Sequence, residues 1–356
     1  MPSSMLSSKN LKAAIPVPTT AAQVVSAGRT AVQNILSRRD HRLLVIVGPC
    51  SIHDPKAALE YAQRLNLLAE ALKPHLAIMM RTYFEKPRTT IGWRGLMSDP
   101  HLDGTCDMPA GVERARRLLI DINALGVPCA TESLDPLLVD YTDDLVGWTA
   151  LGARTAESQT HRAMASGLPM PVGMKNGTEG QITVAIDAVE TAAHSQTYLG
   201  ANDDGQIAVR ASTGNPFGHV VLRGGAQGPN YGSAHVQACE QALAARGLAQ
   251  QIVIDCSHAN SGKVPGRQVD VLADVSKQLL AGNESIVGVM LESHLFDGNQ
   301  PIGDNKASLR YGVSITDACL GWKDTEAALR ELAEGVGRTL SQRADARTKR
   351  TPQQAA

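Results

Sequence analysis

The sequence predicts an α/β protein: a (β/α)8 barrel with an N-terminal extension and an inserted β-hairpin. Eight short apolar runs alternate with segments of helical periodicity, which is the pattern of a parallel barrel surrounded by helices. Each run is continuously apolar, as expected of strands that are covered on both faces. A doubly wound open sheet is the alternative, but the eight repeats and the lack of a GxGxxG turn after the first run favour the barrel. The runs occupy residues 43–48, 76–81, 128–132, 148–154, 171–175, 219–223, 251–257 and 285–292.

The elements follow in a regular order along the chain. Residues 1–40 form the predicted extension, in which AAQVVSAGRTAVQNILSRR has a helical pattern, and the TIM barrel is expected to occupy residues 41–342. Residues 82–109 form a long loop after the second run, and the DDG turn within 195–217 predicts the inserted hairpin. Residues 343–356 are expected to be a disordered tail. Helices are predicted at 55–72, 109–126, 179–193, 233–247, 269–282 and near 323–340.

Composition excludes several classes of partner. The chain has 356 residues, a formal net charge of -1 and a pI near 6.8, which argues against nucleic acid or a membrane surface as partner. It has no apolar stretch of the roughly 20 residues that span a bilayer. It also lacks the pattern of a signal peptide, so we expect a cytoplasmic protein. The six cysteines are widely spaced and form no CxxC pair, which predicts free thiols, most of them in the core.

Each predicted strand ends on or near a polar side chain. In barrels of this kind the active site lies at the C-terminal ends of the strands. Any one such residue, taken alone, is more often a surface charge, but eight together indicate a site. In chain order these residues are Cys50, Arg81, Glu132, Arg154, Lys175, Arg223, His258 and Glu292.

The cations of this set predict an anion site. Arginine matches phosphate or carboxylate with two hydrogen bonds, and lysine adds a point charge, so a small phosphorylated acid is the expected ligand. Ion pairing with Glu132 and other acids is the structural alternative. The loop YFEKPRTTIGWRGL (83–96) offers Lys86, Arg88 and two threonines around Pro87, either as a second anion site or as a solvated basic loop. Two anion sites over one mouth suggest two phosphorylated substrates and hence a condensation.

Four further side chains suit a metal ion. Cys50, His258, Glu292 and Asp317 offer one sulfur, one nitrogen and two carboxylates from four separate loops. This mixture favours Mn²⁺, Fe²⁺, Co²⁺ or Zn²⁺ over Mg²⁺ or Ca²⁺. A core thiol at Cys50 is the alternative, and His294 is a competing nitrogen ligand. Cys256, two residues before His258, is interpreted as core.

Long motifs carry a family resemblance. GPCSIHD, MRTYFEKPRTTIGWRGL, GARTAESQTHRAMASGLPMPVGMKNGT, GHVVLRGG, DCSHANSGK, ESHLFDGNQ and YGVSITDACLGW resemble the type I 3-deoxy-D-arabino-heptulosonate 7-phosphate (DAHP) synthases. More narrowly, they are similar to the bacterial and fungal group regulated by aromatic amino acids. The resemblance runs from about residue 40 to 340 and includes the extension. It implies the first step of the shikimate pathway, in which phosphoenolpyruvate and D-erythrose 4-phosphate condense with water to give DAHP and phosphate.

The resemblance also implies roles for the residues above. Phosphoenolpyruvate would be held by the four strand-end cations, and erythrose 4-phosphate by the KPRT stretch. A single divalent metal ion would be held by the thiol, the imidazole and the two carboxylates. We expect catalytic roles for Lys86, His258, Glu132 and Lys175, with the last two around the reacting water. The residues implied for substrate binding are Arg81, Arg154, Lys175 and Arg223, and then Lys86, Pro87, Arg88 and Thr89; those implied for the metal are Cys50, His258, Glu292 and Asp317.

The family further implies a Phe, Tyr or Trp effector and a homodimer or homotetramer, with the extension and the hairpin helping to build the effector site. Residues 134–145, LDPLLVDYTDDL, depart from the Pro-Gln-Tyr pattern of many relatives, and Pro169 stands where many have Ser. Competing interpretations are the related 3-deoxy-D-manno-octulosonate 8-phosphate synthase, a non-catalytic aromatic amino-acid sensor and, more distantly, a class II aldolase.

Overall fold

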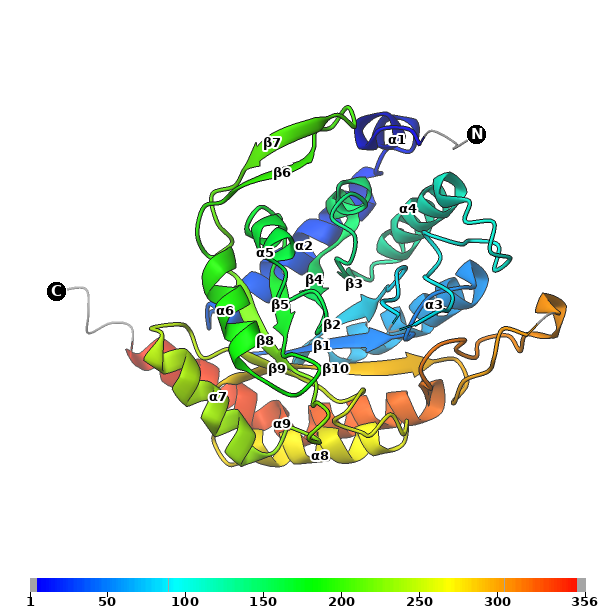
Figure 1. The fold of residues 1–356 in the computed structure, drawn as a ribbon. Coiled ribbons are helices and arrows are strands. Elements are labelled where there is room, and N and C mark those ends of the chain that lie inside the picture. The colour runs from blue at the N-terminus through cyan, green and yellow to red at the C-terminus, as the bar shows by residue number, and fades with distance from the viewer. Residues whose placement is uncertain (1–4, 89, 304, 351–356) are drawn as a thin grey trace.

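The chain closes into a parallel barrel, and the predicted fold class is confirmed (Figure 1). The computed structural model describes residues 5–88, 90–303 and 305–350. Within these residues, eight parallel strands form a continuous sheet that closes where β10 pairs with β1. In sheet order they are β1 (Leu43–Gly48), β2 (Leu76–Arg81), β3 (Cys129–Glu132), β4 (Trp148–Leu151), β5 (Val172–Lys175), β8 (Gly218–Leu222), β9 (Ile252–Asp255) and β10 (Ile286–His294), and the short β11 (Leu320–Gly321) adds to the end of β10.

Helices surround the sheet, and some of them begin after a residue whose side chain caps the helix. Asp54 precedes Pro55 and accepts hydrogen bonds from the amides of Lys56 and Ala57, which favours a helix start there. Asp107 caps the next helix in the same way, through the amide of Ala110. The barrel helices are α3 (Pro55–Leu72), α4 (Met108–Ala124), α5 (Gln159–Ser166), α6 (Thr183–Ala192), α7 (Ser233–Ala245), α8 (Arg267–Leu280) and α9 (Trp322–Arg350). Short 3-10 turns complete the described elements: η1 (Val139–Tyr141) and η2 (Asp143–Leu145) between β3 and β4, and η3 (Lys306–Ser308). No helix in the described ranges is both long enough and apolar enough to cross a membrane.

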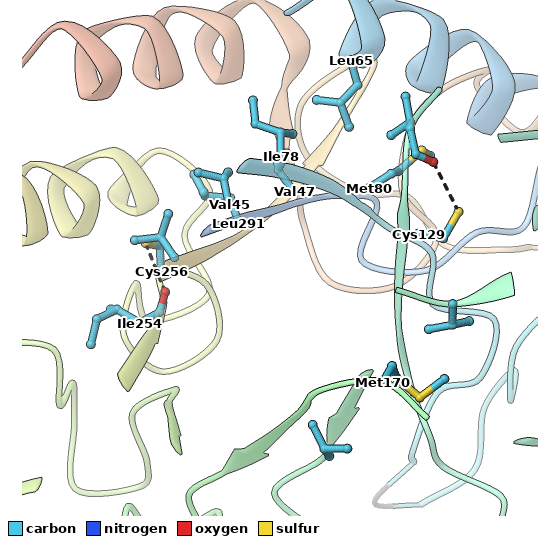
Figure 2. Close-up of a cluster of buried hydrophobic side chains, with 14 of the residues drawn as sticks. Val45, Val47, Leu65, Ile78, Met80, Cys129, Met170, Ile254, Cys256 and Leu291 are labelled. Carbon is cyan, nitrogen blue, oxygen red and sulfur yellow. Dashed lines mark hydrogen bonds between the residues drawn. The ribbon is translucent and has the colours of Figure 1, made fainter. Parts of the chain in front are cut away.

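Alternation along the strands divides the core into two layers. Val45 and Val47 of β1 point outward to the helices and belong to the same buried cluster as Leu65 of α3 (Figure 2). Leu44 and Ile46 of the same strand point into the barrel, where they join a separate buried cluster. The strands therefore use one face to attach the helices and the other to fill the barrel.

The N-terminal extension forms two helices with different neighbours. In α2 (Thr19–Leu36), Val32, Ile35 and Leu36 belong to the cluster that fills the barrel interior, so this helix covers the N-terminal ends of the strands. In contrast, α1 (Ser8–Ala14) lies beside the tip of the hairpin, where Lys9 Nζ is 3.0 Å from an Asp204 carboxylate oxygen (Figure 1).

The inserted hairpin is confirmed. Its strands β6 (Thr197–Ala201) and β7 (Ile207–Ala211) pair antiparallel and leave the barrel between α6 and β8. The segment η1–η2 connects the hairpin to α1, because Arg210 Nη1 of β7 is 2.5 Å from Asp140 and Lys12 Nζ of α1 is 2.6 Å from Asp143. Extension, η1–η2 and hairpin thus form one connected layer on the flank of the barrel.

Element ends were predicted less well than element types. The disordered tail does not begin at residue 343, because α9 continues to Arg350 through alanine, arginine and lysine, which favour helix. Residues 351–356 lie outside the described residues. The fourth and seventh strands end at Leu151 and Asp255, earlier than the apolar runs indicated, since the residues that follow turn toward the barrel mouth.

Candidate active site at the mouth of the barrel

A cavity of about 170 Å³ lies at the C-terminal ends of the strands. Its lining contains six cationic side chains and two carboxylates, so its field favours anions. The sequence placed most of these residues here correctly, although their roles remain predictions. The lining residues are Lys86, Pro87, Arg88, Glu132, Gly152, Ala153, Arg154, Lys175, Arg223, His258, Lys263, Thr316 and Asp317. Thr89, expected at the same loop, lies outside the described residues.

A group that could hold a metal ion lies beside this cavity. Ligand atoms of Cys50, Glu292 and Asp317 all lie within 4.8 Å of one another. His258 lies next to them, with Nε2 at 3.7 Å from Glu292 Oε1. The competing nitrogen ligand, His294, is not in this group: its Nδ1 accepts from the amide of Leu295, and its ring packs against Tyr61. A buried thiol with two carboxylates and an imidazole fits a divalent transition metal.

Local backbone geometry brings these ligands together. Gly48 ends β1 with φ +156°, and a Cβ at this position would lie 2.8 Å from the carbonyl oxygen of Arg81, so only glycine lets the chain turn Cys50 inward here. Glu292 is held through its backbone: its amide donates to Gln268 Oε1, and its carbonyl accepts from Gln268 Nε2. A helix side chain thereby fixes the position of a strand-borne ligand.

Two buried cations balance the charge of this group. Lys86 Nζ is 3.1 Å from Cys50 Sγ, and Arg81 Nη2 is 2.8 Å from Glu292 Oε1. Burial raises the pKa of the Cys50 thiol, and the charge of Glu292 adds to the effect while Lys86 opposes it. For Glu292, burial also works to raise the pKa, but His258, Arg81 and Lys86 outweigh it and hold the pKa below its ordinary value. Metal binding here requires that the thiol lose its proton.

The predicted cations do not all face the cavity. Arg81 is fully buried, stacks on the Tyr83 ring at 3.5 Å and is absent from the lining, so it supports the metal group from beneath. Lys175 Nζ reaches the cavity and also pairs with Asp255 at 3.1 Å. The alternative of structural ion pairing is therefore partly right, for Arg81 and Lys175.

The loop after β8 is held by buried amides. The backbone amide of Arg223 donates to Asn176 Oδ1 at 2.8 Å, and Asn230 Oδ1 accepts from the amide of Gly224 at 2.7 Å. Asn176 and Asn230 are both buried and bonded to each other. This network fixes the backbone that carries Arg223 to the cavity wall.

Sequence reasoning missed Asp255, the fully buried last residue of β9. Burial works to raise its pKa, but His258 and Lys175 outweigh this, and the pKa lies well below its ordinary value. The available signal was a charged residue ending an apolar run, since a buried charge requires partners. Lys263 and Thr316 of the lining were also missed.

A second cavity, of about 300 Å³, lies on the flank between η1, α5 and the hairpin. Its wall includes Leu137, Met164 and Leu199 and the ion pair between Asp140 and Arg210. A smaller pocket lies between it and the mouth: Glu132 lines both this pocket and the mouth, whereas Val139 and Asp143 line both this pocket and the flank cavity. Glu85 also lines the smaller pocket, and burial together with the charge of Asp135 raises its pKa to about 8.

A barrel with a cation-lined mouth beside a thiol, an imidazole and two carboxylates has the architecture of an enzyme whose site favours anions. Residues 17–330 match the model of the DAHP synthetase I family, and the chain belongs to this family. The predicted family is thereby confirmed.

Known proteins of the family match nearly the whole chain. The Tyr-sensitive phospho-2-dehydro-3-deoxyheptonate aldolase of Escherichia coli K12 is 48% identical over 339 residues, which covers 95% of each chain. The Trp-sensitive enzyme of Enterobacter agglomerans is 51% identical over 337 residues, covering 95% of this chain and 96% of that protein. The solved structure of the Francisella tularensis enzyme has a TM-score of 0.92 and 44% identity, and covers 95% of this chain and 98% of that chain.

Proposed function

We propose that the protein is a DAHP synthase, which condenses phosphoenolpyruvate with D-erythrose 4-phosphate and water into DAHP and phosphate, the first step of the shikimate pathway. The observation that carries this proposal is the cation-lined mouth beside the candidate metal group, in a chain of this family. Both substrates are phosphorylated anions, and together they account for the excess of cations around the cavity.

Phosphoenolpyruvate is assigned to the side of the mouth built from β4, β5 and β8. Arg154, Lys175 and Arg223 converge there on the cavity and would hold its phosphate and carboxylate. Arg81, below the cavity floor, would complete the set predicted for this substrate. Fixed cations would also stabilise the charge that collects on phosphate as its C–O bond breaks.

Erythrose 4-phosphate is assigned to the loop after β2. Lys86, Pro87 and Arg88 line the cavity, and Arg88 Nε donates to the carbonyl of Trp93 at 2.8 Å, which holds the loop in shape. The sugar phosphate would bind Arg88, and Thr89 is proposed as a further contact. The aldehyde would then lie near Lys86, between the loop and Cys50.

We further propose one divalent ion (Mn²⁺, Fe²⁺, Co²⁺ or Zn²⁺) held by Cys50, His258, Glu292 and Asp317. When bound, such an ion supplies Lewis-acid polarisation of the aldehyde oxygen. The Lys86 ammonium would donate a proton or a hydrogen bond to that oxygen as C3 of phosphoenolpyruvate attacks. Glu132 and Lys175 face the same cavity, where the Lys175 ammonium would orient the water that adds to C2 and the Glu132 carboxylate would accept its proton.

The assay that tests the proposal supplies phosphoenolpyruvate with either erythrose 4-phosphate or arabinose 5-phosphate, in the presence of Mn²⁺. We expect phosphate release and a seven-carbon product with erythrose 4-phosphate alone. Turnover with arabinose 5-phosphate alone would indicate the octulosonate synthase, and no turnover with either sugar would contradict an enzymatic role.

An aromatic amino acid is proposed as the effector, bound in the flank cavity. The apolar wall suits an aromatic ring, and the Asp140–Arg210 pair offers one charge for each end of a zwitterion. Relatives of similar identity are named Tyr-sensitive and Trp-sensitive, so Phe, Tyr and Trp should each be tested as inhibitors.

Assembly as a homodimer or homotetramer is proposed as well, since Leu199, Ile207 and Val209 of the hairpin are exposed apolar side chains. All six cysteines are free thiols, which supports the proposed cytoplasmic location.

A further inference from the structure

We infer that Asp255 is a positioning residue that fixes both the tautomer of His258 and the place of the Lys175 ammonium group. The inference rests on the proposed function of the mouth, because it concerns one proposed metal ligand and one proposed substrate contact. Asp255 lies at the end of β9 with 0% exposure, beneath the cavity that His258 and Lys175 line.

Both carboxylate oxygens of Asp255 have partners. Oδ2 is 2.9 Å from His258 Nδ1 and 3.1 Å from Lys175 Nζ. Oδ1 accepts from the Ser257 hydroxyl at 2.6 Å and from the Ser257 amide at 3.1 Å. One oxygen therefore faces the site, while the other is anchored to the following turn.

This arrangement selects one tautomer of His258. The Ser257 hydroxyl has a single proton, which it donates to Asp255, so its oxygen, 2.8 Å from His258 Nδ1, can only accept there. Both neighbours of Nδ1 are then acceptors, and Nδ1 must carry the ring proton. Nε2 is left with its lone pair on the side of Glu292, which is the form that binds a metal ion.

The backbone makes such an anchor necessary. His258 adopts φ +55°, in the left-handed region, three residues after β9 has ended. Its ring direction is therefore not set by the strand. The Asp255 carbonyl accepts from Asn260 Nδ2 at 2.8 Å, and the His258 carbonyl accepts from the amide of Lys263 at 2.8 Å, so the turn closes around the carboxylate.

The shared oxygen couples two functions of the mouth. Because Oδ2 contacts both His258 and Lys175, its loss should weaken metal binding and phosphoenolpyruvate binding together. In Asp255→Asn the volume is unchanged, but an amide cannot accept from His258, Lys175 and Ser257 at once. If the amide oxygen of the variant stays toward Ser257, the amide NH2 group faces the Nδ1 proton of His258 and the ammonium of Lys175, and it cannot accept a hydrogen bond from either.

The first experiment titrates metal-free protein with Co²⁺ and follows the absorption of the thiolate complex, so that its readout does not depend on turnover. We expect Asp255→Asn to weaken Co²⁺ binding by about 10- to 100-fold, as loss of a carboxylate behind a histidine ligand does. Asp255→Glu should recover part of the affinity. Asp270→Asn, on the exposed first turn of α8, is the matched control and should bind as the wild type does. Wild-type affinity in a folded Asp255→Asn protein would overturn the inference.

A second measurement needs no variant. In wild-type protein labelled with ¹⁵N-histidine and loaded with Zn²⁺, the His258 proton is expected on Nδ1, and a proton on Nε2 would overturn the inference. The KM for phosphoenolpyruvate should also rise in Asp255→Asn. If the wild-type protein makes no DAHP but Asp255→Asn still binds Co²⁺ more weakly than the wild type, the proposed function is refuted and the role of Asp255 at His258 stands.

Discussion

The mouth of the barrel and the flank cavity differ in how the chain builds them. The mouth collects side chains from the ends of successive strands and is dominated by cations. The flank cavity is walled by a 3-10 segment, a helix and a hairpin, and is apolar apart from a few charged side chains, among them one ion pair. Relatives with different named effectors match this chain almost equally well. The lining of the mouth thus suits the proposed phosphorylated substrates, whereas the lining of the flank cavity suits the proposed aromatic effector.

The largest effect is expected from removing the thiol at the mouth. Cys50→Ser should keep the fold but lose most bound metal and lower kcat by about 100-fold or more, since a Lewis acid contributes several kcal/mol to such a step. Metal content, circular dichroism and kcat check this. Cys106→Ser, at an exposed cysteine, is the control and should be unchanged. A fully active, metal-replete Cys50→Ser enzyme would mean that this thiol is only core.

A substitution among the cations that line the mouth should affect substrate binding without affecting metal binding. Arg223→Ala is expected to raise the KM for phosphoenolpyruvate by about 10- to 100-fold, the value of one or two charged hydrogen bonds, and to leave Co²⁺ affinity unchanged. Steady-state kinetics and Co²⁺ titration measure the two effects. Arg330→Ala, which breaks an exposed ion pair on α9, is the control. Equal KM values for phosphoenolpyruvate in the two variants would show that Arg223 does not bind this substrate.

The flank cavity should affect regulation and not turnover. Arg210→Ala is expected to raise the inhibition constant of the effector by about 10- to 100-fold, because a charged contact contributes about 1.5–3 kcal/mol, while kcat stays at the wild-type value. Inhibition curves with Phe, Tyr and Trp test this, with Arg117→Ala on α4 as the control. A fall in kcat without a change in inhibition would break the distinction between the two regions.

The smallest effect concerns the space between the two cavities. Glu85 has a pKa of about 8, so the folded protein keeps a proton that the unfolded chain releases near pH 4.5. The free energy of unfolding should therefore fall as pH rises from about 4.5 to 8. Glu85→Gln cannot ionise, so it does not show this fall. The free energy of unfolding of the variant minus that of the wild type should therefore be greater at pH 8 than at pH 5 by about 1–3 kcal/mol. Denaturant unfolding at the two pH values checks the sign, and an unchanged difference would mean that Glu85 is ionised.

The sequence predicted the residues at the mouth better than the buried residues beneath it. Cys50 and Glu292, two of the three clustered side chains, were placed at the mouth because strand ends meet at one rim, a rule that needs no side-chain geometry. The burial of Arg81 and the role of Asp255 depend on which way side chains turn below that rim, and apolar runs do not report this. The flank cavity joins segments that lie far apart in sequence, so only its separate parts could be recognised as candidates.

The two helices of the extension have separate structural uses. Because α2 contributes Val32, Ile35 and Leu36 to the cluster inside the barrel, removing it would leave the base of the barrel open to water. By contrast, α1 rests on the flank, beside the hairpin. A chain shortened to begin near residue 18 should therefore fold into an enzyme that the effector no longer inhibits. A chain shortened past residue 36 should not fold. The expected boundary between the two effects lies between α1 and α2.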